Sequence, residues 1–283
     1  MQVLENIADL KKYLQLQANA GFSVALVPTM GNLHEGHMAL IDAAAIECDI
    51  VLATLFINPT QFGPNEDFEK YPRSYEADKE LLASHSCDVL FAPSVSEMYP
   101  RGLTGNTLIK AAAIAEKHCG ASRPGHFDGV CSVVCKLLNL VNPDKVLFGK
   151  KDYQQLHIIK TMVKDLFIPV EIIGIETKRD NTGLALSSRN SYLSQAQKQQ
   201  ASILYQTLQQ TAQLLTSDKS TTFSEMENTA CTQISNAGLR PDYFTICNAH
   251  SLLPATKDDQ QLVILCAAYL GETRLIDNIS VTL

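Results

Sequence analysis

The chain has 283 residues, of which 46% are hydrophobic and 19% are charged, values typical of a globular protein with a substantial core. Its net charge of −7, without any dense run of lysine and arginine, argues against a nucleic-acid-binding protein, and no stretch approaches the roughly 18 apolar residues of a membrane span. The N-terminus lacks a signal-peptide pattern and the eight cysteines contain no C-x-x-C pair, so we predict a cytoplasmic protein with reduced thiols that binds neither nucleic acid nor a membrane.

Strand and helix patterns alternate over the first part of the chain. Apolar runs predict strands at 22–29, 49–57, 87–93, 144–149 and 170–177. Helical periodicity predicts helices at 3–19, 36–48, 74–85, 128–141 and 152–167. Most of these strands are continuous apolar runs, which is typical of parallel strands that are covered on both faces. We therefore predict an α/β fold with a Rossmann-like parallel sheet and helices on both faces.

A change in composition near residue 178 indicates a second domain. A polar, turn-rich segment is followed by predicted helices at 194–216 and 222–237 and by short predicted strands at 242–247, 261–269 and 275–281. The sequence thus predicts a domain of residues 1–177 and a smaller α+β C-terminal domain of residues 178–283. In open α/β sheets, ligands bind outside the carboxyl ends of the strands, so the residues that follow each strand are the candidates for function.

The turn after the first of these strands carries two histidines. In "MGNLHEGH" (30–37), His34 and His37 share a face if the helix begins near His34. Helix starts usually carry Asp, Ser or Thr, so a histidine pair indicates that a ligand supplies the negative charge, and a phosphate fits at free backbone N–H groups. Gly36 has no side chain, so an adenine or a phosphate could approach the backbone closely there. The alternatives are a pair of partly exposed histidines or a metal site, for which no third ligand is spaced nearby.

Two further segments could contact an acidic substrate. After the second strand, Asn58 and Gln61 bring neutral amides to the sheet edge, which can orient a hydroxyl or carboxylate without neutralising it, although "NPTQ" is also a common turn. In a Pro-Gly loop, Arg123 lies near His126 and could bind a carboxylate or phosphate bidentately. The alternative there is an ordinary loop with Asp128 as the N-cap of the next helix.

Two basic segments are candidates for binding phosphates. Lys151 follows a strand that ends at Gly149, and a lysine in the first turn of a helix opposes the helix dipole unless an anion is bound there. The spacing of Asp152 and Gln155 also fits a capping box. In the segment 179–194, the hydroxyl groups of Ser187 and Ser188 and the guanidinium of Arg189 suit a triphosphate. The alternative is a surface loop in which Ser194 caps the next helix.

These segments together resemble a known family. The strand, H-x-G-H and helix, with a later serine-and-arginine loop, are similar to the nucleotidyltransferase superfamily that includes class I aminoacyl-tRNA synthetases. More narrowly, "PTMGNLHEGH", "FINPTQF", "RPGHFDGV", "FGKKDYQQL" and "LALSSRN" resemble pantothenate synthetases (pantoate–β-alanine ligases) over nearly the whole chain. The resemblance implies that ATP and pantoate form pantoyl-adenylate and pyrophosphate, and that β-alanine then gives pantothenate and AMP. It also implies a cytoplasmic homodimer that requires Mg²⁺, with the C-terminal domain closing over a nucleotide and pantoate site.

The resemblance also implies roles for individual residues. Expected ATP contacts are Met30, Gly31, Asn32, Leu33, His34, Glu35, Gly36, His37, Gly149, Lys150, Lys151, Asp152, Lys178, Leu186, Ser187, Ser188 and Arg189. Expected contacts with pantoate or β-alanine are Gln61 and Gln155, to which the motifs add Asn58 and Arg123. His37 is the expected proton donor, with His34 and Lys151 as further catalytic residues, and no metal ligand is expected from the chain.

The family pattern is not matched everywhere, and two other functions remain open. Lys150 stands where Glu is expected, Leu186 where Met is usual, and Asn248 where an acidic residue is common. One alternative is a nucleotidyltransferase of the same fold that transfers AMP or CMP to a phosphate ester, a site that should contain more cations for its second substrate. The other is a nucleotide-binding regulatory module without catalysis.

Overall fold

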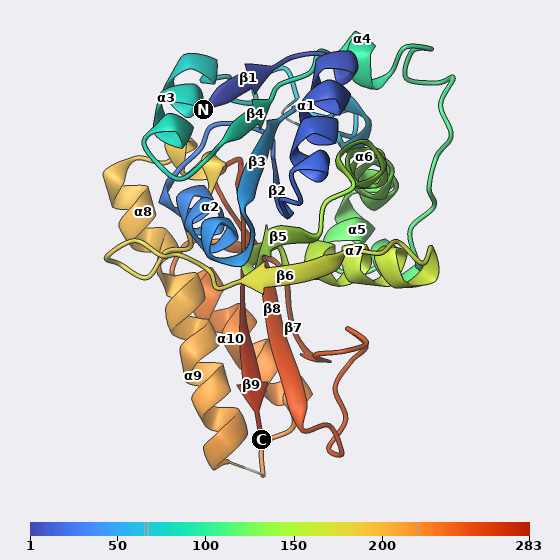
Figure 1. Cartoon of the computed structure of the whole chain (residues 1–283). Coiled ribbons are helices and arrows are strands. Elements are labelled where there is room, and N and C mark those ends of the chain that lie inside the picture. The colour runs from blue at the N-terminus through green and yellow to red at the C-terminus, as the bar shows by residue number, and fades with distance from the viewer. Residues whose placement is uncertain (65, 67, 219) are drawn as a thin grey trace. The chain divides into compact units, whose positions relative to one another are not determined.

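The computed structural model describes residues 1–64, 66, 68–218 and 220–283, and these form two compact units (Figure 1). The first unit contains Met1–Lys150 and Gln155–Glu176. The second contains Lys151–Gln154 and Thr177–Leu283. The short segment Lys151–Gln154 therefore belongs with the C-terminal residues, although the chain on either side of it belongs to the first unit.

The first unit is built on a six-stranded parallel sheet. Its strands, in spatial order, are β1 (Gln2–Leu4), β4 (Val89–Phe91), β3 (Ile50–Leu55), β2 (Val24–Thr29), β5 (Lys145–Gly149) and β6 (Glu171–Ile175). The strand order reverses between β2 and β5, and ligands of such sheets bind beside this reversal, at the carboxyl ends of the strands. The loops after β2 and β5 contain two of the candidate segments from the sequence.

Helices cover both faces of this sheet. The helices and turns that follow the strands are α1 (Ile7–Asn19), α2 (Glu35–Glu47), η1 (Pro59–Gln61), α3 (Tyr75–Ala83), α4 (Val95–Met98), η2 (Ala113–Glu116), α5 (Cys119–Ser122), α6 (His126–Val141), η3 (Lys150–Asp152) and α7 (Tyr153–Asp165). Val27 and Ala53 pack with Ile41 of α2, whereas Leu26 and Leu52 alternate to the opposite face and are also fully buried. Figure 1 shows α2 and α3 on one side of the sheet and α1 and α6 on the other. The predicted α/β fold is confirmed.

Three local predictions were wrong. The helix predicted at 3–19 begins only at Ile7, because residues 2–4 form the edge strand β1, which is too short to show a strand pattern, and Asn6 caps the helix by accepting the N–H of Asp9. Asp128 is not the N-cap of α6: the helix begins earlier, and the Asp128 carboxylate accepts the backbone N–H of Ala111. The helix predicted at 194–216 is interrupted at Ser202.

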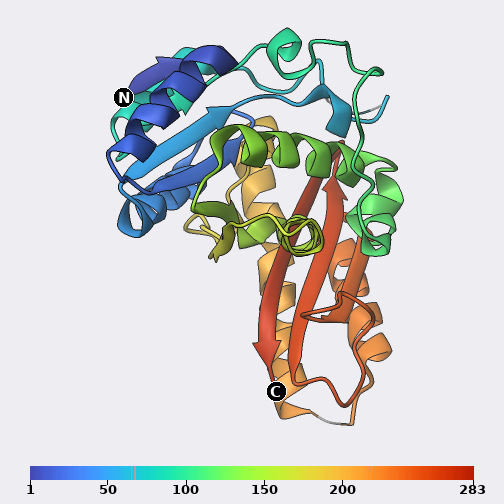
Figure 2. The same cartoon turned by 45° about the vertical axis from the view of Figure 1, so that its right-hand side comes forward.

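The second unit is an antiparallel sheet of three strands with helices. The strands are β7 (Arg240–Asn248), β8 (Gln261–Leu270) and β9 (Thr273–Thr282), and the helices are η4 (Ser188–Tyr192), α8 (Gln195–Ala201), α9 (Ile203–Ser217) and α10 (Phe223–Asn236). Ile246 and Ile264 on the sheet form a core with Leu208 of α9 and Ile234 of α10. Figure 2 shows the long strands β8 and β9 beside these helices. This unit matches the predicted smaller α+β part of the fold.

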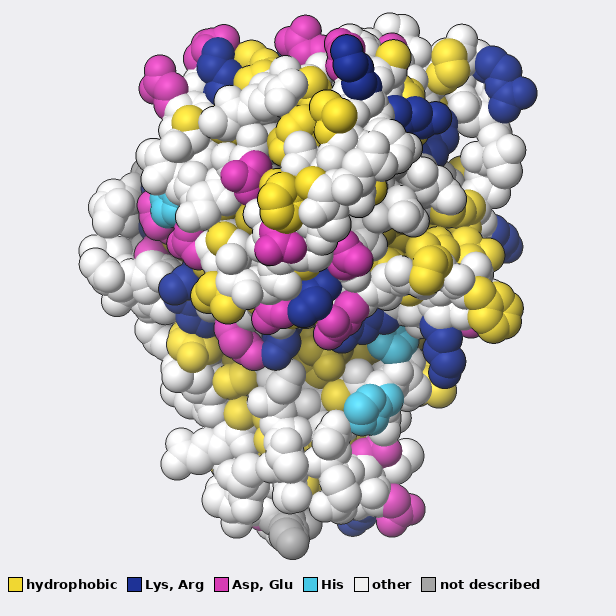
Figure 3. All heavy atoms as spheres, in the orientation of Figure 1, with side chains coloured by type: hydrophobic (Ala, Val, Ile, Leu, Met, Phe, Trp, Pro, Cys, Tyr) yellow, Lys and Arg dark blue, Asp and Glu magenta, His cyan; other side chains and the backbone are white. Residues whose placement is uncertain are grey.

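The surface of the first unit carries charges of both signs. Figure 3 shows lysine and arginine side chains interspersed with aspartate and glutamate over the face in view. Among the described residues, no helix is long and apolar enough to cross a bilayer.

Candidate active site

The loop after β2 is held by a buried carboxylate that sequence analysis missed. Gly31 and Asn32 both adopt left-handed backbone conformations, with φ of 87° and 50°. The Asp78 side chain on α3, in a residue that is 2% exposed, accepts the backbone N–H of Asn32 at 2.9 Å and that of Leu33 at 2.8 Å. The Ser74 hydroxyl donates to the same carboxylate at 3.1 Å. Asp78 thus stabilises an otherwise unfavourable loop and occupies N–H groups that a phosphate could have used.

The two histidines cap helix α2. His34 is the N-cap residue, and its Nδ1 accepts the N–H of Gly36 at 3.1 Å. His37 Nδ1 accepts the backbone N–H of His34 at 3.3 Å, and the two ring centroids are 4.1 Å apart. The predicted proximity of the rings is confirmed. Because each Nδ1 accepts a hydrogen bond, both rings are neutral in this arrangement and carry their hydrogen on Nε2.

Both the oxygen and the nitrogen of the Asn58 side-chain amide form hydrogen bonds with other residues of the chain. It is 1% exposed, and its Oδ1 accepts the Tyr99 hydroxyl at 2.7 Å and the Thr60 hydroxyl at 3.0 Å. Its Nδ2 donates to Gln61 Oε1 at 3.1 Å and to the Gly129 carbonyl at 3.2 Å. Burial raises the pKa of the Tyr99 hydroxyl, which keeps it protonated and able to donate. In this structure Asn58 therefore orients Gln61.

Gln61 links the candidate substrate residues to the histidine loop. Because its Oε1 accepts from Asn58, its Nε2 is the end of the amide that can donate to a ligand oxygen. This Nε2 lies 3.1 Å from the sulfur of Met30, the first residue of the segment 30–37 that contains the two histidines and is called the histidine loop here. Thioether sulfur is a weak acceptor, so a carboxylate or hydroxyl oxygen would be a stronger partner for the same N–H group.

Arg123 is engaged with neighbouring side chains. Its Nε donates to Glu66 Oε1 at 2.9 Å, and its Nη2 pairs with the other oxygen of the same carboxylate. Its Nη1 is 3.0 Å from His126 Nε2, while His126 Nδ1 is 2.7 Å from the Gln61 carbonyl oxygen. The carbonyl can only accept, so the proton of His126 is on Nδ1 and its Nε2 accepts from Arg123. Arg123 thus supports the backbone of Gln61 in this structure.

Other candidate residues of the first unit have different surroundings. Gly149 ends β5, and the side chain of Lys150 forms an ion pair with Glu176, so its extra positive charge is compensated. Gln155 is half-buried on α7, and Glu35 is exposed in the first turn of α2.

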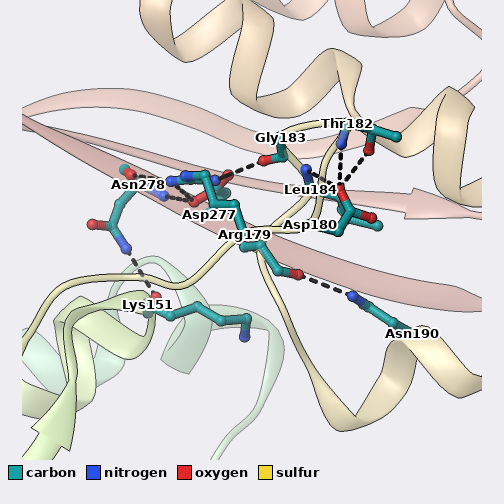
Figure 4. Close-up of polar contacts among 10 residues, drawn as sticks. Lys151, Arg179, Asp180, Thr182, Gly183, Leu184, Asn190, Asp277 and Asn278 are labelled. Carbon is teal, nitrogen blue, oxygen red and sulfur yellow. Dashed lines mark hydrogen bonds and ion pairs between the residues drawn. The ribbon is translucent and has the colours of Figure 1, made fainter. Parts of the chain in front are cut away.

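The remaining candidates lie in the second unit. Lys151 is mostly buried, with its Nζ 3.9 Å from Asp152 Oδ2, and its backbone carbonyl accepts from Asn278 Nδ2 at 2.9 Å (Figure 4). The exposed Lys178 pairs through its backbone carbonyl with the N–H of Leu186 at 2.9 Å.

The serine-and-arginine segment forms the turn η4. Ser187 caps η4 by accepting the N–H of Arg189 at 3.3 Å, and both Ser188 and Arg189 are half-buried. The predicted cap at Ser194 is confirmed, because Ser194 and Gln197 form a capping box at the start of α8. Within the described ranges, no group of three or more His, Cys, Asp or Glu residues could hold a metal ion.

Comparisons with known proteins point to one family. The family model for pantoate-β-alanine ligase matches residues 2–280. The pantothenate synthetase of Idiomarina loihiensis is 50% identical over 282 residues, which cover 100% of this chain and 98% of the relative. That of Marinobacter nauticus is 49% identical and covers 100% of both chains.

Solved structures give the same result. A crystal structure of pantothenate synthetase from Thermus thermophilus superimposes with a TM-score of 0.91 at 40% identity, covering 99% of each chain. A pantoate-β-alanine ligase from Francisella tularensis, complexed with "Beta-gamma ATP" and β-alanine, superimposes with a TM-score of 0.80 at 37% identity and covers 99% of this chain and 97% of that one.

Proposed function

Because the chain belongs to the pantoate-β-alanine ligase family, we propose that it is an ATP-dependent ligase that joins pantoate to β-alanine through a pantoyl-adenylate. In the first step, a pantoate carboxylate oxygen bonds to the α-phosphorus of ATP, and the α–β phosphoanhydride bond breaks to release pyrophosphate. In the second step, the β-alanine amine bonds to the acyl carbon, the carbon–oxygen bond to AMP breaks, and the amine loses its proton. The products are pantothenate and AMP.

The observation that carries this proposal is the contact between Gln61 and Met30. Gln61 Nε2 lies 3.1 Å from Met30 Sδ, and this contact supports the proposal that pantoate binds at Gln61 next to ATP at the histidine loop. A carboxylate must attack an anionic phosphate, so holding the two together is a large part of the task, and positioning can supply roughly 7–11 kcal/mol. A neutral amide donor orients the carboxylate without removing the charge that makes it a nucleophile.

Neutral and cationic donors would stabilise the charge that builds on the α-phosphate. We assign the Nε2–H groups of His34 and His37 to phosphate oxygens, because their Nδ1 atoms are used in capping α2. Lys151 would supply a positive charge. Losing one such donor typically costs about 2.7–4 kcal/mol in the transition state. His37 is also the proposed proton donor.

The other site residues follow from family membership. The proposed ATP contacts are Met30, Gly31, Asn32, Leu33, Glu35, Gly36, Gly149, Lys150, Asp152, Lys178, Leu186, Ser187, Ser188 and Arg189, and Gln155 is proposed for pantoate. The described residues offer no carboxylate cluster for Mg²⁺, so the ion would bind through the ATP phosphates, whose charge it would neutralise. That the protein is a cytoplasmic homodimer and that residues 178–283 close over bound ligands stay predictions.

The direct test is pyrophosphate release from ATP, measured with pantoate alone and then with β-alanine added. We expect release that depends on pantoate and becomes sustained turnover with β-alanine, with pantothenate and AMP formed in equal amounts. ATP binding without pantoate-dependent release would refute the proposal. Release that depends instead on a phosphate ester would indicate a nucleotidyltransferase of the same fold.

A further inference from the structure

A buried polar pair lies in the middle of strand β9. Asp277 and Asn278 are 4% and 7% exposed, and they lie between Ile276 and Ile279. Burial of a carboxylate and an amide is unfavourable unless both find partners. Arg179 supplies the first partner: its Nη1 and Nη2 donate to the two oxygens of Asp277 at 2.6 and 2.9 Å, and its guanidinium stacks 3.6 Å from the Tyr205 ring centroid.

One side of this pair holds the loop that leads to η4. Arg179 Nη1 also donates to the Gly183 carbonyl at 3.1 Å (Figure 4). Arg179 also forms an isolated antiparallel bridge with Ala185. Inside this loop, the Asp180 carboxylate accepts the N–H groups of Thr182 and Leu184. The chain continues directly from Ala185 into the proposed ATP segment 186–189, so the contacts of Arg179 with Asp277, Gly183 and Ala185 hold the residues that precede this segment.

The other side of the pair holds Lys151. The backbone N–H of Asn278 donates to Oδ1 of the preceding residue, Asp277, at 2.8 Å. The side-chain Nδ2 of Asn278 donates to the Lys151 carbonyl at 2.9 Å. Figure 4 shows Asn278 extending from β9 to the backbone of Lys151, with the lysine side chain continuing from there. Lys151 is distant in sequence from Asn278, yet the two lie in the same compact unit.

We infer that Asp277 and Asn278 are positioning residues, which fix Lys151 and the segment 186–189 relative to each other within the second unit. The inference rests on the proposed function, because it matters for catalysis only if both segments contact ATP. Neither residue needs to touch the nucleotide. Their contribution is to hold two groups of donors in one arrangement, since donors that must move into place at each turnover stabilise the transition state less.

The test compares Asn278→Ala with the control Asp242→Asn. Asn278→Ala removes the bond to the Lys151 carbonyl. The control weakens the Asp242–Arg274 ion pair, which joins β7 and β9 of the same sheet away from both segments. Pyrophosphate release should show kcat/KM for ATP reduced by about 100-fold in Asn278→Ala. The KM for pantoate should stay unchanged, and the control should match the wild type in both constants.

A double-mutant cycle shows whether Asn278 acts through Lys151. In a Lys151→Ala background, adding Asn278→Ala should change kcat/KM for ATP by less than about twofold, because the side chain that it positions is gone. If Asn278→Ala unfolds, Asn278→Asp keeps the size of the side chain, removes the Nδ2 donor and serves in the same cycle. Wild-type kinetics in the single variant, or a full additional loss in the double variant, would overturn the inference while leaving the ligase function intact. A wild-type protein without pantoate-dependent release would overturn the proposed function itself, and the inference with it.

Discussion

Gly129 offers a sharp test of how Gln61 is positioned. It lies on α6 where that helix crosses η1, the turn that carries Gln61. A Cβ atom added at Gly129 would lie 2.3 Å from the Thr60 carbonyl oxygen and 2.8 Å from the Gln61 Cα. Real Cβ atoms essentially never lie within 3.0 Å of such an atom, and ordinary van der Waals contact begins at 3.4 Å, so Gly129→Ala must separate the two backbones by about 0.7–1.1 Å. Backbone atoms cannot rotate away as the end of a flexible side chain can, so η1 has to shift relative to α6.

The expected consequence is a selective loss of pantoate use. A displacement of about 1 Å in a positioning group can cost on the order of 100-fold in rate, and we expect this loss in kcat/KM for pantoate. The hydrogen bonds that shape the histidine loop come from Asp78 on α3, so the KM for ATP should change little. Overpacking typically costs about 1–3 kcal/mol, while Ala in place of Gly in a helix gains about 1 kcal/mol. The free energy of unfolding should therefore fall by about 0–2 kcal/mol.

Pyrophosphate release at varied pantoate and at varied ATP measures both constants, and denaturant unfolding measures stability. Gly63→Ala is the matched control. It makes the same substitution two residues after Gln61, where the nearest atom to the new Cβ is a Glu66 side-chain oxygen at 3.5 Å. The control should stay within about twofold of the wild type. Gly129→Ala with wild-type kcat/KM for pantoate would refute the claim that the contact between α6 and η1 places Gln61.

Three further predictions concern individual side chains. Asp78→Asn replaces one of the two oxygens that accept the N–H groups of Asn32 and Leu33 by a donor. Hydrogen bonds to a charged group contribute about 1.5–3 kcal/mol, so the KM for ATP should rise at least about tenfold. The control is Asp88→Asn, which alters the acceptor of the Val51 N–H and should leave the KM for ATP unchanged. His34→Asn should keep the stability of the wild type, because Asn is a good N-cap, but should lower the pyrophosphate release rate by about 10²–10³-fold through loss of the Nε2–H; an unchanged rate would limit His34 to capping. Burial raises the pKa of the Cys131 thiol to about 12, so the thiol is protonated at pH 8. Cys131 should therefore react with Ellman's reagent only in denaturant. Equal reaction rates of Cys131 with and without denaturant would contradict this.

The sequence predicted the parallel sheet because each of its longer strands is a continuous apolar run. Strands that are buried on both faces carry apolar residues on both sides, so β2, β3 and β5 appear in the sequence as continuous apolar runs. The edge strand β1 could not, because three residues carry no period, and its pairing with β4 is decided by tertiary contact. The break at Ser202 was missed for a similar reason: helical periodicity continues through it, and Ser202 itself keeps a right-handed helical backbone conformation.

The sequence also predicted which segments to examine, but not which side chains support them. Motif residues such as His37 and Gln61 stand next to strand ends, where chemistry is expected. Asp78 stands in helix α3 and Tyr99 directly follows the short helix α4, and their partners Asn32 and Asn58 lie at least 41 residues away along the chain. A local signal that the sequence does carry is the Asp277-Asn278 pair between Ile276 and Ile279, since a buried polar pair needs partners that the strand itself cannot supply.

The histidine pair shows how one residue type can serve structure and chemistry at once. Ser or Asp would cap α2 with an acceptor, but neither carries a donor at the far end of its side chain. A neutral imidazole has an acceptor and a donor on separate ring atoms, and in His34 and His37 the acceptor Nδ1 is used for the cap. Protonation of Nδ1 would break the cap, so the helix itself favours the neutral ring. The same fold that orients each ring therefore keeps its Nε2–H as the donor that the proposed adenylation step requires.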